Sequence, residues 1–88
     1  MKKAKQLERY CKGAANHRRI EILFLLAKAE GLTLDAIAEE LHCNIKTTSE
    51  HTRRLAHAGL LNKKYQGPSV AHSLSPYGRR FVDFLKTF

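Results

Sequence analysis

The sequence has only two cysteines, Cys11 and Cys43, and they do not form a CxxC pair. This spacing indicates neither a disulfide framework nor a zinc knuckle, so we expect free thiols. A long apolar run is also missing, because the most hydrophobic stretch, residues 22–29, is too short to cross a bilayer and lies inside the chain. These absences predict a soluble, cytoplasmic protein without a membrane partner and without a signal peptide.

Acidic residues are scarce as well. The 88 residues include 8 Asp and Glu against 16 Lys and Arg, which gives a formal net charge of +8. Such an excess favours a polyanionic partner, and nucleic acid is the first candidate. Because 43% of the residues are hydrophobic, enough for one modest core, we expect residues 1–88 to form a single domain.

Apolar periodicity and end signals predict four helices in the first two-thirds of the chain. A thin apolar stripe marks a short first helix, which Gly13 is expected to interrupt. Asn16 is a good N-cap for a second, mostly buried helix, and Thr33 can cap a third. Asn44 caps a fourth helix over about residues 45–58. Since a turn of only three residues separates the third and fourth helices, the two form a helix-turn-helix.

The rest of the chain predicts a β-hairpin and one more helix. The segments LLNKKY and VAHSL are typical of short strands, and the turn-like QGPS between them completes a wing over about residues 60–74. Ser75 as N-cap and Pro76 at the first helical position begin a last helix over about residues 76–88. The predicted fold class is therefore mainly α with a small two-stranded β wing, a winged helix-turn-helix.

The sequence resembles the ArsR-type (arsenic-repressor-like) transcription regulators of bacteria and archaea in three successive segments, ANHRRIEILFLL, LTLDAIAEELHCNIKTTSEHTRRLAHAGLLNKK and GPSVAHSLSPYGRRFVDFL. Together these segments cover nearly the whole chain. The resemblance implies a sequence-specific double-stranded DNA-binding regulator, typically a dimeric repressor that acts by occupying its operator. The alternative from another class is a winged helix used for protein–protein contacts, or as a small subunit of a larger assembly.

The exposed face of the fourth helix carries the expected DNA contacts. An α-helix fits the major groove, and its N-terminal half reaches base edges. The base-reading candidates in that half are Lys46, Thr47, Ser49 and Glu50. His51 lies on the shoulder of the helix and belongs to the segment that resembles the family. Arg53 and Arg54 lie further along, where each could reach a guanine edge or neutralise phosphate.

Charge is segregated between the two helices of the motif. Residues 33–43 contain three acidic residues and no Lys or Arg, whereas residues 44–66 contain five Lys or Arg against one Glu. A merely solvated polar face, which is the alternative interpretation of the fourth helix, does not require this segregation. The pattern therefore favours DNA binding.

Basic residues outside the fourth helix leave alternatives open. Lys63 and Lys64 lie on the first wing strand, where alternation points them to opposite faces, so we expect one phosphate contact between them. The resemblance places Arg19 at the family's arginine at the start of the second helix, where a phosphate contact and a structural ion pair are both open. Residues 1–19 hold seven Lys or Arg against one Glu, which is either an arm that tracks the DNA backbone or solubilising charge.

Large apolar side chains line one side of the last helix: Tyr77, Phe81, Phe84, Leu85 and Phe88. This stripe exceeds what so small a core needs and indicates association. The alternative is that the last helix folds back on the first helix of its own chain. The resemblance implies a homodimer through the first and last helices, with Leu7 in the interface and two recognition helices about 34 Å apart.

No metal site, cofactor or enzymatic activity is expected. The serines and histidines form no nucleophile and base set, and the chain has no glycine-rich phosphate loop. The cysteine pairs and the Asp, His and Glu sets with which members of the family sense metals are missing. His42 and Cys43 alone are too few ligands for zinc, so we expect Cys43 to pack the turn as a small buried residue.

Thr48 and Thr52 occupy the seam of the fourth helix that must pack on the core, where the family usually has aliphatic residues. We expect both hydroxyls to donate to backbone carbonyls one turn back, because an unpaired buried hydroxyl is costly.

Overall fold

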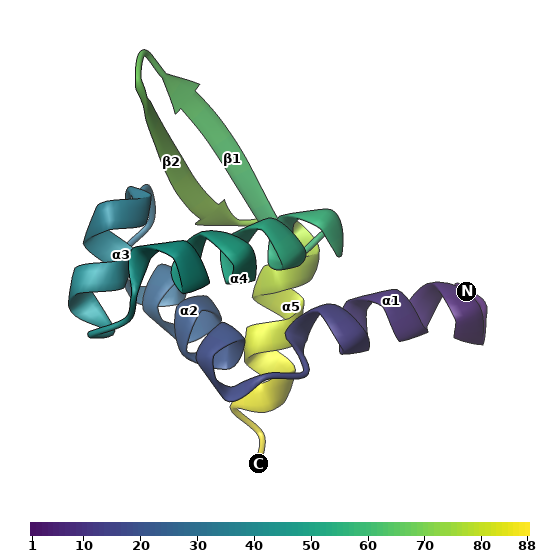
Figure 1. Cartoon of the computed structure of the whole chain (residues 1–88). Helices are drawn as coiled ribbons and strands as arrows, with labels where there is room; N and C mark the ends of the chain where they lie inside the picture. Colours follow the sequence, from purple (N-terminus) through teal and green to yellow (C-terminus); the bar gives the residue numbers. More distant parts are fainter.

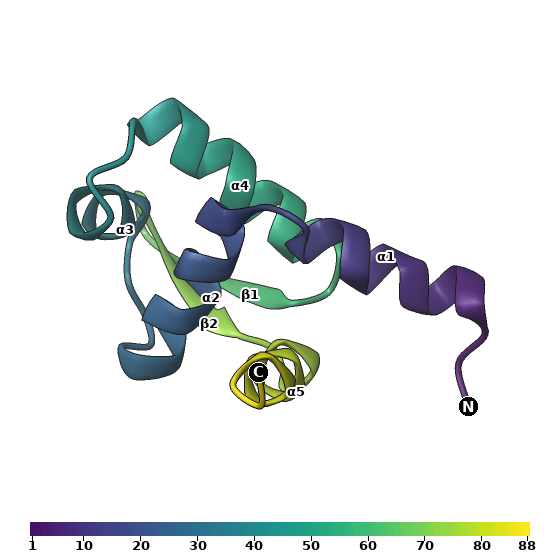
Figure 2. The same ribbon diagram turned by 90° about the horizontal axis from the view of Figure 1, so that it is seen from below.

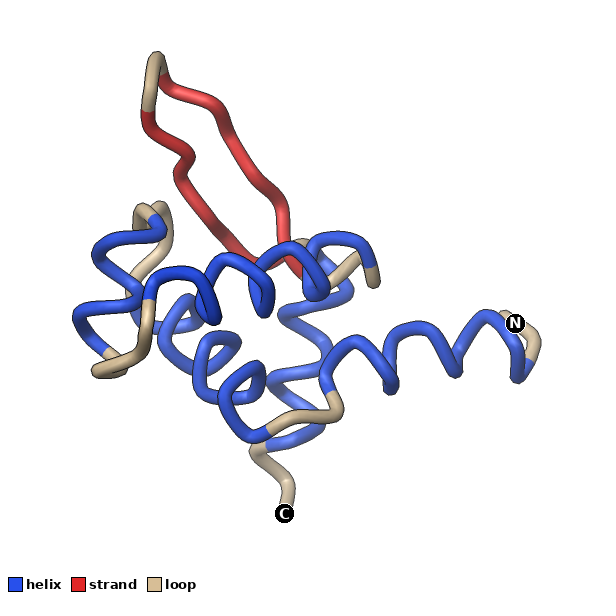
Figure 3. Tube along the Cα trace, in the orientation of Figure 1, coloured by secondary structure: helices blue, strands red, loops and turns tan.

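The computed structural model describes residues 1–88 as five helices and one two-stranded antiparallel sheet (Figures 1 and 3). The elements in chain order are α1 (Ala4–Ala14), α2 (His17–Lys28), α3 (Leu34–Glu40), α4 (Ile45–His57), β1 (Leu61–Gln66), β2 (Ser69–Leu74) and α5 (Pro76–Leu85). This order confirms the predicted winged helix-turn-helix. No helix combines the length and the apolarity that a bilayer crossing requires.

The predicted N-caps are confirmed. Side-chain oxygens of four residues accept hydrogen bonds from backbone N–H groups of the turn that follows: Asn16, Thr33, Asn44 and Ser75. These bonds satisfy donors that the first turn of a helix leaves without an intrahelical acceptor. The caps therefore determine where α2, α3, α4 and α5 begin.

The core is built around α2, which lies between α4 and α5 when the molecule is seen from below (Figure 2). Leu23 and Leu26 are fully buried and belong to one cluster with Leu55 of α4 and Val82 of α5. Complete burial of one such side chain contributes about 1.5–3 kcal/mol to the free energy of unfolding. The confirmed central helix thus gives α4 a rigid support for one of its faces.

Two expectations about helix ends are wrong. Gly13 does not interrupt α1, which continues to Ala14. A Cβ at Gly13 would overlap the Cβ of Ala58, so the glycine allows α1 to cross tightly against the end of α4. The last helix ends at Leu85 rather than at residue 88, and turn hydrogen bonds hold the final residues.

The wing projects away from the helices (Figure 1) and is anchored at its base. The backbone N–H of Gly31 donates to His72 O at 2.8 Å, and the N–H of His72 donates to Leu32 O at 2.9 Å. These bonds attach β2 to the loop between α2 and α3, a contact that no local sequence pattern predicts. At the tip, Gly67 has a positive φ of 62°, which glycine adopts without strain.

The SPYG segment joins the end of α4 to the start of α5. The Ser75 hydroxyl donates to Gly59 O at 2.6 Å and accepts from the N–H of Gly78 at 3.0 Å. A Cβ at Gly78 would meet Leu60 O, so the close approach requires glycine. This arrangement fixes α5 relative to the recognition helix α4.

Candidate nucleic-acid interface

The recognition helix α4 has one buried and one open face. Its N-cap Asn44 orients the first turn, and Thr48, Thr52 and Leu55 lie 1% exposed or less against the core. The opposite side presents a row of polar side chains: Lys46, Thr47, Ser49, Arg53, Arg54 and His57. The structure thus brings the predicted base-reading and arginine side chains onto one helix.

The two buried threonines are satisfied as expected. Thr48 Oγ1 donates to Asn44 O at 2.9 Å, and Thr52 Oγ1 donates to Ser49 O at 3.0 Å. Because each hydroxyl has an acceptor within its own helix, neither leaves an unpaired polar group in the core. Their methyl groups can then pack against the core as the apolar part of the seam.

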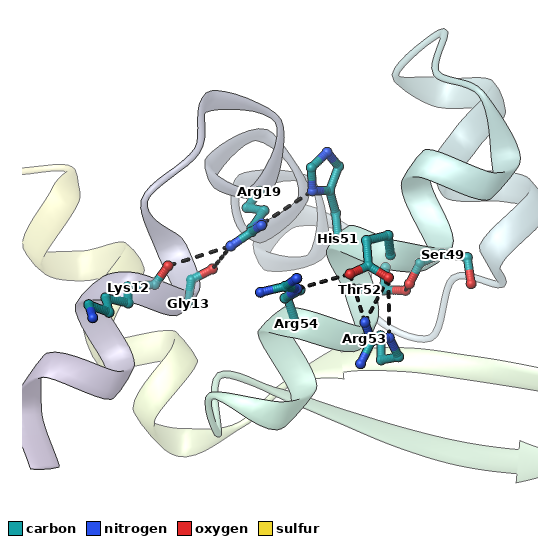
Figure 4. Close-up of polar contacts among 9 residues, drawn as sticks. Lys12, Gly13, Arg19, Ser49, His51, Thr52, Arg53 and Arg54 are labelled. Atoms are coloured by element: carbon teal, nitrogen blue, oxygen red, sulfur yellow. Dashed lines mark hydrogen bonds and ion pairs between the residues drawn. The ribbon is translucent and has the colours of Figure 1, made fainter.

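Glu50 binds both neighbouring arginines on the open face. Its carboxylate accepts from Arg53 Nη2 at 2.7 and 2.8 Å and from Arg54 Nε at 2.9 Å (Figure 4). Hydrogen bonds from Arg53 and then from Arg54 lower the pKa of Glu50 to about 2, so the carboxylate is ionised at neutral pH. The sequence carries a signal for these ion pairs, because Arg53 and Arg54 follow Glu50 at the helical spacings i+3 and i+4. Exposed pairs of this kind exchange readily for other partners.

Arg19 joins three elements without an ion pair. Its Nη1 donates to Gly13 O at 3.1 Å and to Lys12 O at 3.5 Å, and its Nε donates to His51 Nδ1 at 3.2 Å (Figure 4). The open alternative of a structural ion pair is therefore wrong: the guanidinium holds the end of α1 against α4 through neutral acceptors. Burial, and then the charge of Arg19, lower the pKa of His51.

The lysines of the wing diverge as predicted. Lys63 is half-buried and pairs across the strands with His72, whereas Lys64 is exposed opposite Ala71. Lys63 lines a polar cavity of about 450 Å³ between α3, α4 and the wing, together with Ser49. His72 is buried in the same cavity, and its Nδ1 lies 2.9 Å from Leu32 O. Burial lowers the pKa of this imidazole.

A second concavity lies at the other side of α4. This basic cleft, about 350 Å³ between α1, α2 and α4, is lined by Arg9, Lys12, Gly13, Arg19, Arg53, Arg54, His57 and Ala58. No acidic residue lines it. The cleft therefore shares its two α4 arginines with the open face of the recognition helix.

An apolar groove between α1 and α5 forms a third surface. It measures about 460 Å³ and is lined mainly by Leu7, Tyr10, Cys11, Leu60, Tyr77, Phe81 and Phe84. Leu7, Phe84 and Phe88 are 46%, 56% and 91% exposed. Leu85 is half-buried, and the rings of Tyr10 and Tyr77 lie 5.3 Å apart. The last helix therefore contacts α1, as the alternative proposed, yet most of the predicted aromatic stripe stays uncovered.

Tyr10 and Cys11 of this groove were not predicted as site residues. Their signal was the apolar stripe on α1, since Cys11 follows Leu7 at i+4. At the helix-turn-helix turn, Cys43 is half-buried rather than buried, and its Sγ lies 3.5 Å from Leu41 O. Both cysteines are free thiols, and no group of three His, Cys, Asp or Glu side chains is placed to hold a metal ion.

Comparison with known proteins matches the sequence model of the MarR family to residues 15–66, which is more than half of the chain. The match runs from the N-cap region of α2 to the end of β1 and therefore contains the whole helix-turn-helix. No curated protein matches the sequence.

Solved structures of transcription regulators share the fold. One is a homodimeric winged helix-turn-helix DNA-binding domain from Mycobacterium bovis, a possible ArsR-family regulator, with 28% identity and a TM-score of 0.85 over 94% of this chain and 77% of that one. HlyU from Vibrio cholerae has 26% identity and a TM-score of 0.84 over 97% and 94%. MepR of S. aureus in complex with DNA has a TM-score of 0.80 over 94% and 72%, and at 18% identity it shows the fold alone.

Proposed function

The chain belongs to the MarR family, and from that premise we propose that it is a transcription regulator that binds double-stranded DNA sequence-specifically. One observation carries the proposal: the second helix of the helix-turn-helix presents an open, predominantly basic face, and such a helix enters the major groove. The DNA-binding relative from M. bovis supports it. The whole of residues 1–88 acts as one binding domain, in the cytoplasm and on the nucleoid. No catalytic activity is proposed.

Each predicted contact residue has a place in this proposal. Lys46, Thr47, Ser49 and Glu50 reach base edges from the N-terminal half of α4. Arg53 enters the groove after exchanging Glu50 for a base, and Arg54 and Arg19 contact phosphate. His51 acts indirectly: its Nδ1 accepts the hydrogen bond from Arg19 Nε and so helps to orient that guanidinium. Lys63 and Lys64 lie on opposite faces of β1, so one of them supplies a phosphate contact, and we propose the exposed Lys64 for this role.

We assign the chain more finely to an ArsR-type homodimer formed by α1 and α5. The proposed interface consists of Leu7, Tyr77, Phe81, Phe84, Leu85 and Phe88. Four of these are exposed in the folded chain, whereas Phe81 and Leu85 are half-buried. The homodimeric M. bovis relative, a possible ArsR-family regulator, supports this assignment. A twofold dimer would place two α4 helices about 34 Å apart, which fits two half-sites one DNA turn apart. Occupying such an inverted repeat at an operator represses transcription.

Selection of bound sequences from a random duplex pool tests the proposal. We expect enrichment of an inverted repeat with half-sites about one helical turn apart. Titration of the selected duplex at increasing salt should give an affinity that falls linearly on a log-log plot, because bound phosphates release counterions. Absence of binding at low salt would contradict DNA recognition and favour a winged helix that serves protein contacts.

A further inference from the structure

The basic cleft between α1, α2 and α4 brings together five Lys and Arg side chains, and only two carboxylates, Glu8 and Glu50, pair with them. Neither Arg9 nor Arg19 has a carboxylate partner. Lys12 pairs with Glu8 at 3.3 Å, but both side chains are exposed, so this pair contributes little to stability and can exchange. Several like charges facing one concavity repel each other. They indicate that an anion belongs there.

Arg19 is held ready to bind that anion. Its hydrogen bonds to Gly13 O, Lys12 O and His51 Nδ1 fix the guanidinium between α1 and α4 (Figure 4), while Nη2 makes no hydrogen bond within the chain. A pre-oriented guanidinium loses little conformational entropy on binding, and its planar donors suit phosphate oxygens. The free donor is thus available at no cost in ordering.

The composition of the cleft selects the chemical class of the ligand. Ala58 is its only hydrophobic residue, and no Phe, Tyr or Trp side chain lines it. His57 and Ala58 offer little surface on which to stack a nucleobase, whereas the many Lys and Arg donors match the oxygens of a phosphodiester. The ligand is therefore a phosphate group.

The position of the cleft indicates the source of the phosphate. Arg53 and Arg54 line the cleft and also lie on the open face of α4. A strand that borders the major groove occupied by α4 would therefore pass over the cleft and reach α1. We propose that the cleft binds phosphates of the DNA backbone and that Arg9 and Lys12 each add one phosphate contact from the first helix. This inference rests on the proposed function and resolves whether the basic residues 1–19 track DNA: these two do.

The test compares two double variants with the same change in charge. Arg9→Gln with Lys12→Gln removes the α1 side of the cleft. Lys5→Gln with Lys28→Gln removes two exposed lysines that do not line it. Affinities for the selected duplex and for a random duplex are measured by fluorescence anisotropy over a salt series. Thermal unfolding checks that each variant folds.

The cleft variant should lower the slope of log affinity against log salt by about 1.8, that is, about 0.9 for each lost phosphate contact. It should weaken both duplexes by the same factor, about tenfold or more near physiological salt, because phosphate contacts carry no sequence information. The control variant should change the slope much less. Lys12→Arg, which keeps the charge, should bind like the wild type.

Three results would overturn the inference. If the control variant lost as much slope as the cleft variant, the effect would come from total charge and not from the cleft. If the slope of the cleft variant were unchanged, α1 would lie outside the DNA interface. A titration with inorganic tripolyphosphate, followed by NMR, tests for a free phosphate ligand. If the cleft variant abolished this binding while its slope for DNA stayed unchanged, the ligand of the cleft would be a free phosphate and not DNA. If the wild type binds no duplex at all, the proposed function itself fails.

Discussion

The aromatic groove of α1 and α5 and the charged face of α4 are both exposed, but they are stable in water for different reasons. On α4, Glu50 already neutralises part of the charge of Arg53 and Arg54, and water solvates the rest. At the C-terminal end of the chain, the exposed ring of Phe84 contacts only other aromatic rings: Phe88, with ring centroids 5.2 Å apart, and Phe81, with centroids 6.3 Å apart. Exposed apolar area carries a standing cost, whereas exposed charge does not. The exposed groove therefore fits the proposed dimer interface, whereas the charged face is stable in water without a ligand.

The largest expected effect is at the groove. Phe84→Asp places a charge in the middle of the proposed dimer interface, where it would have to be desolvated without a partner. Sedimentation should show a monomer, and affinity for a two-half-site duplex should fall to near that of a single half-site. Tyr65→Asp, which alters an even more exposed aromatic residue on the wing, should leave the oligomeric state unchanged. A wild type that sediments as a monomer would contradict the proposal that the exposed groove is a dimer interface.

A smaller effect is expected on the charged face. Arg53→Ala should lower affinity for the selected duplex by about 10- to 100-fold and relax the preference for one base, as expected for loss of a bidentate contact to a base edge. Lys64→Ala should weaken selected and random duplexes alike. Binding curves for both variants on both duplexes provide the measurement. If Arg53→Ala weakened binding to the two duplexes equally, Arg53 would contact phosphate and not a base.

The smallest effect concerns the base of the wing. Burial lowers the pKa of His72 in the folded chain, so below the ordinary histidine pKa of about 6.5 the unfolded chain takes up a proton that the folded chain does not. Stability is therefore complete above that pH and is lost as the pH falls. The Tm should decrease modestly from pH 7.5 to 5, and His72→Asn should show a weaker decrease. An unchanged pH dependence in this variant would place the titration elsewhere.

Local signals in the sequence predicted most of the fold. The caps at Asn16, Thr33, Asn44 and Ser75 act within one turn, and apolar spacing reflects the face that a helix buries, so neither depends on distant parts of the chain. The satisfied hydroxyls of Thr48 and Thr52 were predicted for the same reason. Motifs that winged-helix families share indicated the fold more firmly than the family: the resemblance was to ArsR-type regulators, whereas the matching model is that of the MarR family.

Contacts between distant segments could not be predicted in this way. The packing of Gly13 on Ala58 depends on how α1 crosses α4, and the hydrogen bond from Arg19 to His51 depends on how α2 packs against α4. The attachment of β2 to Leu32 depends on where the wing returns. Such contacts arise only once the helices have been placed, because no periodicity within one segment encodes the distance to another. The basic cleft belongs to this class.

The position of Arg19 changes the electrostatic sign of a helix end. Lys12 O and Gly13 O are among the last carbonyls of α1, where the aligned peptide dipoles concentrate negative partial charge. An anion near such a terminus would be repelled. By donating to these carbonyls, Arg19 places a full positive charge beside them, while its Nη2 keeps no partner within the chain. A terminus whose dipole disfavours anions is thereby turned into one that attracts them, and α1 can lie beside a polyanion.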